Sequence, residues 1–217
     1  MPPKVSIILT THGEARYLKQ AIGSVIAQTF EDWKLIIAAD GSYPDVEKLD
    51  ERIHVLSFIW LNVVCRFAHT INNAVRQCAG GEFITYLCHD DLYLPWRLEL
   101  MMMAFEQNPS WDVVFGRQQL ITELEGKTYL SHVRDGDEKQ PAGTVDHSSV
   151  MHRRECFEKA GGWDEAAPMR YGDAHFWKRL IAAGYQFHHI PEILDVHRFN
   201  NQSVTYKIDH PEEGVTA

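Results

Sequence analysis

The chain opens with a strand, a helix and a second strand, and each strand ends in small polar residues. Residues 5–10 form a continuous apolar run typical of a buried parallel strand, and residues 15–28 place apolar side chains at helical spacing. A second apolar run over residues 35–39 ends in Asp40, Gly41 and Ser42. This order predicts an α/β fold in which a ligand binds at the carboxyl ends of the strands. We interpret the opening as half of a nucleotide-binding fold.

The rest of the chain alternates between the same two kinds of element. Apolar runs predict strands at residues 53–56, 83–87, 113–117 and 185–190, and we expect the last to close the sheet. Helices are predicted at residues 43–49, 68–78, 153–160 and 173–183, with a further helix after Pro95. Residues 123–145 are polar and contain Gly126, Gly136 and Gly143, which predicts a mobile loop that closes as a lid. Residues 208–217 are polar and are predicted to form a frayed tail. We expect one domain over residues 1–217.

The charge balance excludes some classes of function. The chain has 21 Lys and Arg against 30 Asp and Glu, a net charge of −9, and such an acidic protein is a poor binder of nucleic acid. No apolar stretch approaches the ~20 residues of a transmembrane segment, and no signal peptide precedes the first strand. The four cysteines form no Cys-x-x-Cys pair, which indicates free thiols in a reducing compartment. We therefore expect a cytoplasmic protein.

The strongest candidate site follows the strand at residues 83–87. His89, Asp90 and Asp91 stand at its end, where carboxylates and phosphate oxygens together suit Mg²⁺ or Mn²⁺. The same residues could instead form a turn that caps the helix after Pro95, so position alone leaves both the metal site and the capping turn open. Asp40 and Thr10 at neighbouring strand ends favour the metal site.

Each of three further residues has two interpretations. Asp173 stands where a helix begins, so it is either an N-cap or an ionised carboxylate held in place as a general base. Arg66 precedes a helix and is either a nucleotide contact or a solvated surface residue. His197 follows the last predicted strand and is either a third metal ligand or a structural histidine.

Taken together, these segments resemble the family 2 glycosyltransferases of the GT-A fold over nearly the whole chain. The resemblance is carried by residues 5–42 with Gln28-Thr29-Phe30, residues 81–86, Asp90-Asp91 with residues 94–98, Arg66-Phe67-Ala68 with Ile71-Asn72, residues 146–153 and Gly172-Asp173-Ala174. It implies a mostly parallel central sheet flanked by helices. Residues 1–91 would form the nucleotide-binding half and residues 92–207 the acceptor-side half.

The resemblance also implies an activity. A sugar would pass, with inversion and with the help of Mn²⁺ or Mg²⁺, from a UDP- or dTDP-sugar to a hydroxyl of a saccharide or other acceptor, in polysaccharide or glycoconjugate biosynthesis. Asp173 would be the catalytic base, Asp90 the metal ligand with Asp91 and His197 beside it, and Asp146 and His147 would lie on the acceptor side. The nucleotide would be held by Thr10, Thr11, His12, Glu14, Asp40, Arg66, His89 and Asp90.

Two other functions remain open on the sequence. A sugar-phosphate nucleotidyltransferase also uses an α/β nucleotide-binding half, but it needs a glycine-rich basic loop, whereas residues 11–14 are short and acidic. A non-catalytic nucleotide-sugar-binding protein would not need both Asp90 and Asp173. Two positions depart from the family pattern: His89 stands where an Asp is expected, and Cys88 occupies the first Asp position. The sequence leaves the sugar, the acceptor and the oligomeric state open, and it is compatible with a homo-oligomer.

Overall fold

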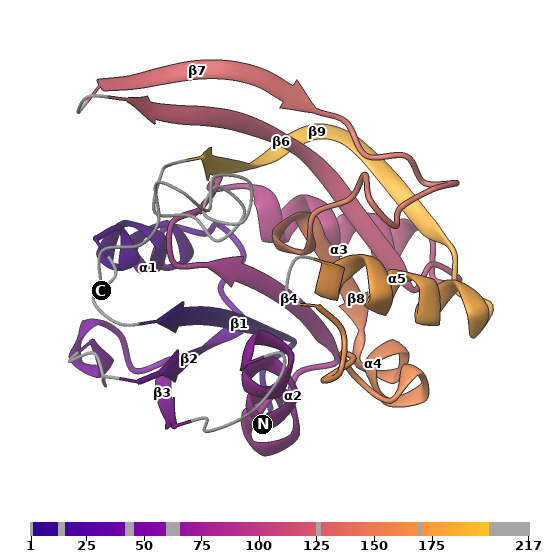
Figure 1. Ribbon diagram of the computed structural model, residues 1–217, viewed down its shortest axis with the longest axis horizontal. Helices are drawn as coiled ribbons and strands as arrows, with labels where there is room; N and C mark the ends of the chain where they lie inside the picture. Colours follow the sequence, from indigo (N-terminus) through magenta and orange to yellow (C-terminus); the bar gives the residue numbers. More distant parts are fainter. Residues whose placement is uncertain are drawn as a thin grey trace.

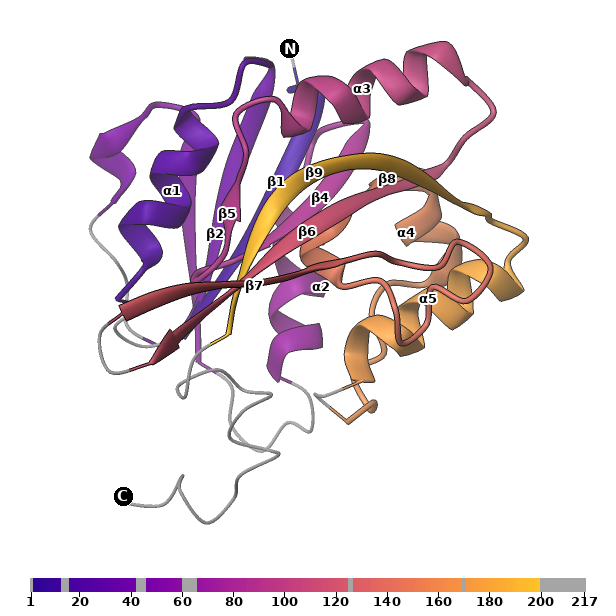
Figure 2. The same ribbon diagram turned by 90° about the horizontal axis from the view of Figure 1, so that it is seen from above.

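In a computed structural model, which describes residues 2–12, 16–41, 46–59, 66–124, 127–168 and 171–199, nine strands form one sheet (Figure 1). The strand order is β3-β2-β1-β4-β8-β6-β9-β5, and β7 pairs with the part of β6 that β8 leaves free. Figure 2 shows the long strands β6, β7 and β9 curving across the sheet above the first strands. The sheet is therefore curled rather than flat.

The first half of the sheet is parallel, as the sequence predicts. β1 (Val5–His12), β2 (Trp33–Asp40), β3 (Ile53–Phe58) and β4 (Phe83–Cys88) run in one direction, so their carboxyl ends meet at one edge. α1 (Leu18–Ile26) and α2 (Arg66–Cys78) connect them and cover opposite faces. Where a helix is predicted over residues 43–49, the described residues contain only the short 3₁₀ turn η1 (Glu47–Leu49).

The second half of the sheet mixes both directions. After β5 (Leu92–Tyr93) and α3 (Arg97–Gln107) come β6 (Val113–Leu124), β7 (Lys127–Arg134), the turn η2 (His147–Ser149), β8 (Val150–Arg153), α4 (Arg154–Ala160), α5 (Gly172–Ala182) and β9 (Phe187–Phe199). β8 is antiparallel to both β4 and β6, whereas β9 is parallel to β6. The parallel arrangement thus belongs chiefly to the first half of the sheet.

Two expectations about this half are wrong. The loop predicted over residues 123–145 begins instead as the end of β6 and the strand β7, which pair as a hairpin; only the following residues are irregular. Six of the eight β7 side chains are exposed, so no apolar pattern marks the strand. The last strand does not close the sheet either: β9 extends to Phe199 and lies between β6 and the edge strand β5.

Two hydrophobic clusters hold the layers together. One joins α1 and α3 to one face of the sheet, and the other joins α2, α4 and α5 to the opposite face (Figure 1). Trp33, Trp163 and Trp177 are among the largest fully buried side chains. Within the described part of the chain, no helix is long and apolar enough to cross a membrane, and Cys78, Cys88 and Cys156 are free thiols. Cys65 and residues 208–217 lie outside the described residues.

Candidate active site

The predicted acidic segment forms the turn between β4 and β5. The backbone N–H of Asp91 donates to the carbonyl of Cys88 across 3.2 Å. The Asp91 side chain is 1 % exposed and receives the backbone N–H of Arg198 at 3.0 Å, while its other oxygen lies 3.1 Å from Nδ1 of His197. The end of β9 therefore fixes one carboxylate of the turn.

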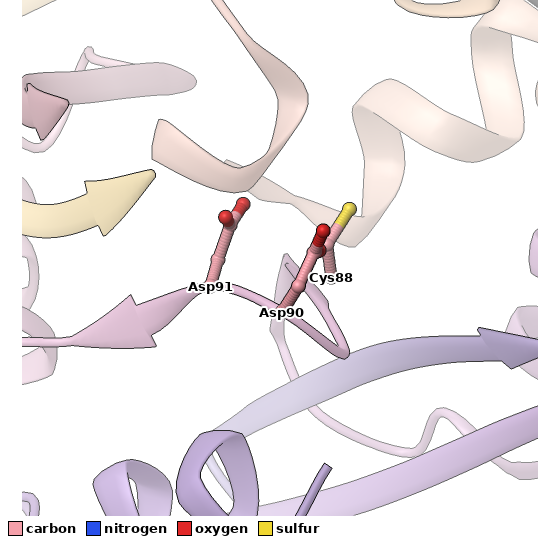
Figure 3. A group of neighbouring side chains, drawn as sticks. All are labelled: Cys88, Asp90 and Asp91. Carbon is pink, nitrogen blue, oxygen red and sulfur yellow. The ribbon is translucent and has the colours of Figure 1, made fainter. Parts of the chain in front are cut away.

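Three overlapping groups of metal-binding side chains extend from this turn. Cys88, Asp90 and Asp91 form the first group, and Figure 3 shows these three side chains pointing to the same side of the turn. The second group is Asp91, Asp146 and His197, and the third is Asp146, His147 and Asp173; within each group the ligand atoms lie within 4.8 Å of one another. The structure thus brings together the residues assigned from sequence to the metal, the acceptor side and the base.

The carboxylates of the first two groups suit a hard divalent cation. Burial raises the pKa of the Asp90 carboxyl, and the neighbouring charge of Asp91 raises it further, whereas His89 and His197 oppose the shift. A cation bound between the carboxylates would relieve this repulsion and receive the oxygen ligands that Mg²⁺ and Mn²⁺ prefer. The residues of the turn therefore fit the ion predicted from the sequence.

His197 and Asp146 carry opposite charges beside the turn. Burial alone would lower the pKa of His197, but the charge and hydrogen bond of Asp91 outweigh it and raise this pKa to about 9. Burial alone would raise the pKa of Asp146, but His147, His197 and Arg134 hold it well below its usual range. His197 is consequently a cation at neutral pH, and it would have to release a proton to ligate a metal ion.

Asp173 lies in the first turn of α5 but is not its N-cap, so the capping interpretation is wrong. The N-cap is Tyr171, and Asp173 accepts the backbone N–H of Ala174 at 2.7 Å. Burial raises the pKa of the Asp173 carboxyl, as does the charge of Asp146, against the opposing effect of His147. A carboxylate with a raised pKa accepts protons more readily, which suits a general base.

The candidate nucleotide residues line the ends of β1 and β2. Asp40 closes β2, and the Arg66 guanidinium at the start of α2 lies 3.8 Å from its carboxylate. Thr10 is half-buried and pairs in register with Cys88, whereas Thr11 is only 5 % exposed. His89 is half-buried in the turn. The side chain of His12 and all of Glu14 lie outside the described residues.

Sequence reasoning missed the residues that support the turn. Arg198 is 5 % exposed, donates from Nε to the carbonyl of Asp90 at 3.0 Å, and places its guanidinium 4.0 Å from the ring of Tyr17. It also pairs with Glu123, which accepts the Tyr17 hydroxyl. No local pattern distinguishes this arginine, because its role depends on three elements that meet only in the folded chain.

A second missed contact concerns Cys88, which stands at the first Asp position of the family pattern. Its Sγ lies 3.3 Å from Nε2 of His147. Burial raises the pKa of this thiol well above its ordinary value, and Asp91, Asp90, Asp146 and Asp173 raise it further. Cys88 is consequently a neutral thiol that joins the β4 end to η2.

A curled mixed α/β sheet with an acidic turn at its carboxyl edge is the GT-A fold. The UDP-GlcNAc complex of TarS residues 1–349 from S. aureus superposes with a TM-score of 0.68 at 16 % identity, over 90 % of this chain and 58 % of that one. The mannosyltransferase PcManGT from Pyrobaculum calidifontis, in complex with GDP-Man and Mn²⁺, superposes with a TM-score of 0.67 at 14 % identity, over 98 % of this chain and 61 % of that one. At these identities the likeness concerns the fold alone.

The sequence comparison goes further. A family model described as glycosyl transferase family 2 matches residues 6–175, so the chain belongs to this family of enzymes. Protein CgeD of Bacillus subtilis is 37 % identical over 199 residues, which cover 83 % of this chain and 46 % of CgeD. The chain thus spans about half the length of that relative. The resemblance inferred from residues 5–42, the Asp90-Asp91 turn and Asp173 is confirmed at the level of the family.

Proposed function

We propose that the chain transfers a sugar, with inversion and with Mn²⁺ or Mg²⁺, from a UDP- or dTDP-sugar to a hydroxyl acceptor in polysaccharide or glycoconjugate biosynthesis. The observation that carries the proposal is the unbroken series of side chains from Asp90 to Asp173, because it offers a cation site at one end and a proton acceptor at the other. Related folds bind UDP-GlcNAc in TarS and GDP-Man with Mn²⁺ in PcManGT. These ligands support a nucleotide-sugar donor.

Each end of the series has a separate task. Asp90 and Asp91 would hold the ion, whose charge stabilises the departing nucleoside diphosphate. Arg66 and Asp40 would contact the nucleotide at the neighbouring strand ends. Asp173 takes the proton of the acceptor hydroxyl while that oxygen bonds to the anomeric carbon and the bond from this carbon to the diphosphate breaks. A single displacement of this kind inverts the anomeric centre and needs no enzyme nucleophile.

Several finer assignments belong to the same proposal. The segments 66–72, 146–153 and 172–174 resemble the spore coat polysaccharide glycosyltransferase SpsA within the family, which favours UDP or dTDP as the carrier. Asp146 and His147 lie next to Asp173, so we place them beside the acceptor. The free thiols support a cytoplasmic setting, and the sequence is compatible with a homo-oligomer.

The deciding experiment is a turnover assay with a panel of sugar nucleotides and Mn²⁺. We expect release of UDP or dTDP from one donor, loss of this release in chelator, and transfer once a suitable acceptor is added. Release of pyrophosphate from a nucleoside triphosphate and a sugar phosphate would instead identify a nucleotidyltransferase. Tight binding of every sugar nucleotide without turnover would identify a binding protein.

A further inference from the structure

A buried ion pair joins α3 to β9, the strand that contacts the acidic turn. Arg97, at the start of α3, is fully buried, and Asp195 of β9 is 1 % exposed; Nε of the arginine lies 3.5 Å from Oδ2 of the aspartate. The guanidinium also lies 3.8 Å from the centre of the Tyr93 ring. Burying two charges costs desolvation energy that their attraction often fails to repay, so an ion pair here calls for a role other than stability.

One nitrogen of Arg97 reaches the segment that carries the acceptor-side residues. Its Nη2 donates to the backbone carbonyl of Ser148 at 2.7 Å and to Oγ1 of Thr85 at 3.0 Å. Ser148 in turn donates to Oδ1 of Asp146 from its backbone N–H at 2.9 Å and from its hydroxyl at 2.6 Å. Gln118 donates to the same hydroxyl at 3.0 Å. The orientation of the Asp146 carboxylate thus depends on where η2 is held.

The other partner of Arg97 belongs to the strand that fixes the acidic turn. Asp195 and His197 are two residues apart on β9, so they project from the same face of that strand. His197 contacts the Asp91 carboxylate. Arg97 therefore connects β9, which holds the turn, with η2, which holds Asp146 and His147.

We propose that Arg97, held by Asp195, is a positioning residue that sets the spacing between the Asp90–Asp91 turn and the Asp146–His147 pair. The proposal rests on the proposed transferase function, in which the turn binds the ion at the donor's diphosphate and the Asp146–His147 pair lies beside the acceptor. Arg97 touches no substrate in this scheme. It acts through the carbonyl of Ser148 and through β9.

A variant that removes both charges separates positioning from stability. Arg97→Met with Asp195→Leu leaves no buried unpaired charge, and apolar replacement of buried ion pairs is commonly neutral or stabilising. We expect this double variant to unfold at or above the wild-type temperature and to keep the KM for the donor within about twofold. Its kcat should fall by roughly 10²-fold, the usual effect of misplacing reacting groups by about 1 Å. Wild-type kcat in the stable double variant would overturn the proposal.

Two further variants are needed: Arg97→Lys as a second test and Arg153→Met as a control. The lysine variant keeps the buried charge beside Asp195 but lacks the planar guanidinium that contacts Asp195 and Ser148 together. We expect its kcat to lie between those of the wild type and the double variant. A kcat equal to wild type in Arg97→Lys would also contradict positioning, and this test stands if the double variant fails to fold.

Arg153 offers a matched control, because it lies 5.1 Å from the Phe83 ring and pairs with Glu82 at the opposite end of β4. Its replacement by Met should leave kcat unchanged.

A readout without turnover keeps this proposal distinct from the proposed function. In the double variant the NMR ring signals of His147 and His197 should shift, while those of His69, which pairs with Glu165 outside the site, should stay in place. Unchanged signals of His147 and His197 would overturn positioning even if the wild-type chain transfers sugar. An inactive wild-type chain whose His147 and His197 signals shift in the variant would instead contradict the proposed function alone.

Discussion

Two separate features characterise the Asp173 carboxylate, namely a backbone hydrogen bond and a raised pKa. Its hydrogen bond from the Ala174 N–H lies within the first turn of α5, where an asparagine oxygen can accept the same bond. Its raised pKa comes from burial and from Asp146. Replacing the carboxylate by an amide therefore removes the proton acceptor and leaves the local backbone bond.

Asp173→Asn should separate catalysis from stability. We expect transfer to fall by roughly 10²–10⁴-fold, the usual contribution of a positioned general base, and stability to change by less than about 1 kcal/mol. The wild-type rate should also decline on acidification at a pH above the ordinary aspartate pKa, since the base must be ionised and its pKa is raised. Asp164, which accepts the backbone N–H of Ala166 at 3.0 Å, supplies the control through Asp164→Asn. Near wild-type transfer in Asp173→Asn would disprove the mechanism.

His152 is a buried neutral histidine whose tautomer is set by its partners. Its Nδ1 lies 2.8 Å from the carbonyl of Arg153 and must donate to it, so Nε2 accepts from the Tyr86 hydroxyl at 2.8 Å. Burial lowers the pKa of His152 to about 4, and the charge of Arg154 acts in the same direction. In the unfolded chain the same group binds a proton near pH 6.5.

Folding stability should therefore depend on His152 in mildly acidic solution. A lowered folded-state pKa means that the unfolded chain takes up more protons, so stability is complete above pH 6.5 and is lost as the pH falls toward 4. We expect this group to cost about 2 kcal/mol between pH 7 and pH 5. Urea unfolding of the wild type and of His152→Gln at both pH values measures it as the difference between the two proteins. Equal pH dependence in both would contradict the neutral buried state.

Helices and strands with a periodic apolar pattern were predictable from the sequence, whereas strands with largely polar or exposed side chains were not. α2 through α5 lie within a few residues of their predicted ranges, because each buries one apolar stripe. β7 was missed because its side chains face solvent, and the far half of β9 was missed because it carries Asp195, His197 and Arg198. Polar residues on a strand look like a loop until the sheet that pairs with them is known.

The site divides in the same way. The placement of Asp90, Asp91 and Asp173 was predictable because they stand at the ends of elements whose positions follow from the apolar pattern. The contacts of Arg97 and Arg198 were not, since they join residues that lie far apart in the chain. Gly116 illustrates the limit: a side chain there would place its Cβ 2.4 Å from Leu194, a constraint that exists only once β6 and β9 pair.

The segment between β7 and η2 remains the candidate lid. Residues 135–145 are irregular. Local bonds such as that from the Asp137 N–H to Oγ1 of Thr144 at 3.0 Å hold the middle of the segment, whereas its ends are anchored by Arg117, which pairs with Asp135 at 2.9 Å, and by Trp177, which donates to the carbonyl of Val145 at 2.9 Å. We expect amide hydrogen exchange in this segment to be fast in the free protein and to slow when nucleotide sugar and Mn²⁺ are added. Strong protection of residues 135–145 before any addition would refute the lid.

The whole molecule joins a parallel first half to a mixed second half through the acidic turn. The turn continues β4 of the first half, while the side chains around it come from η2 and β9 of the second. A ligand that binds the turn should therefore stabilise both halves against unfolding together.

Thermal unfolding tests this coupling. Mn²⁺ with UDP or dTDP should raise the unfolding temperature in one cooperative transition, because ligands that bind only the folded state stabilise it by mass action. Chelator should abolish the shift, and so should Asp90→Asn. Equal nucleotide affinity by calorimetry with and without the ion would contradict the assignment of Asp90 to the metal.

The position of β9 has a consequence for how the enzyme is made. His197 and Arg198, which fix the Asp91 carboxylate and the Asp90 carbonyl, belong to the last strand that the structure describes. During synthesis the first four strands leave the ribosome long before this strand does. A nascent chain therefore exposes an acidic turn that lacks its cationic supports. Under the proposed function, turnover would begin only after β9 has taken its place between β6 and β5.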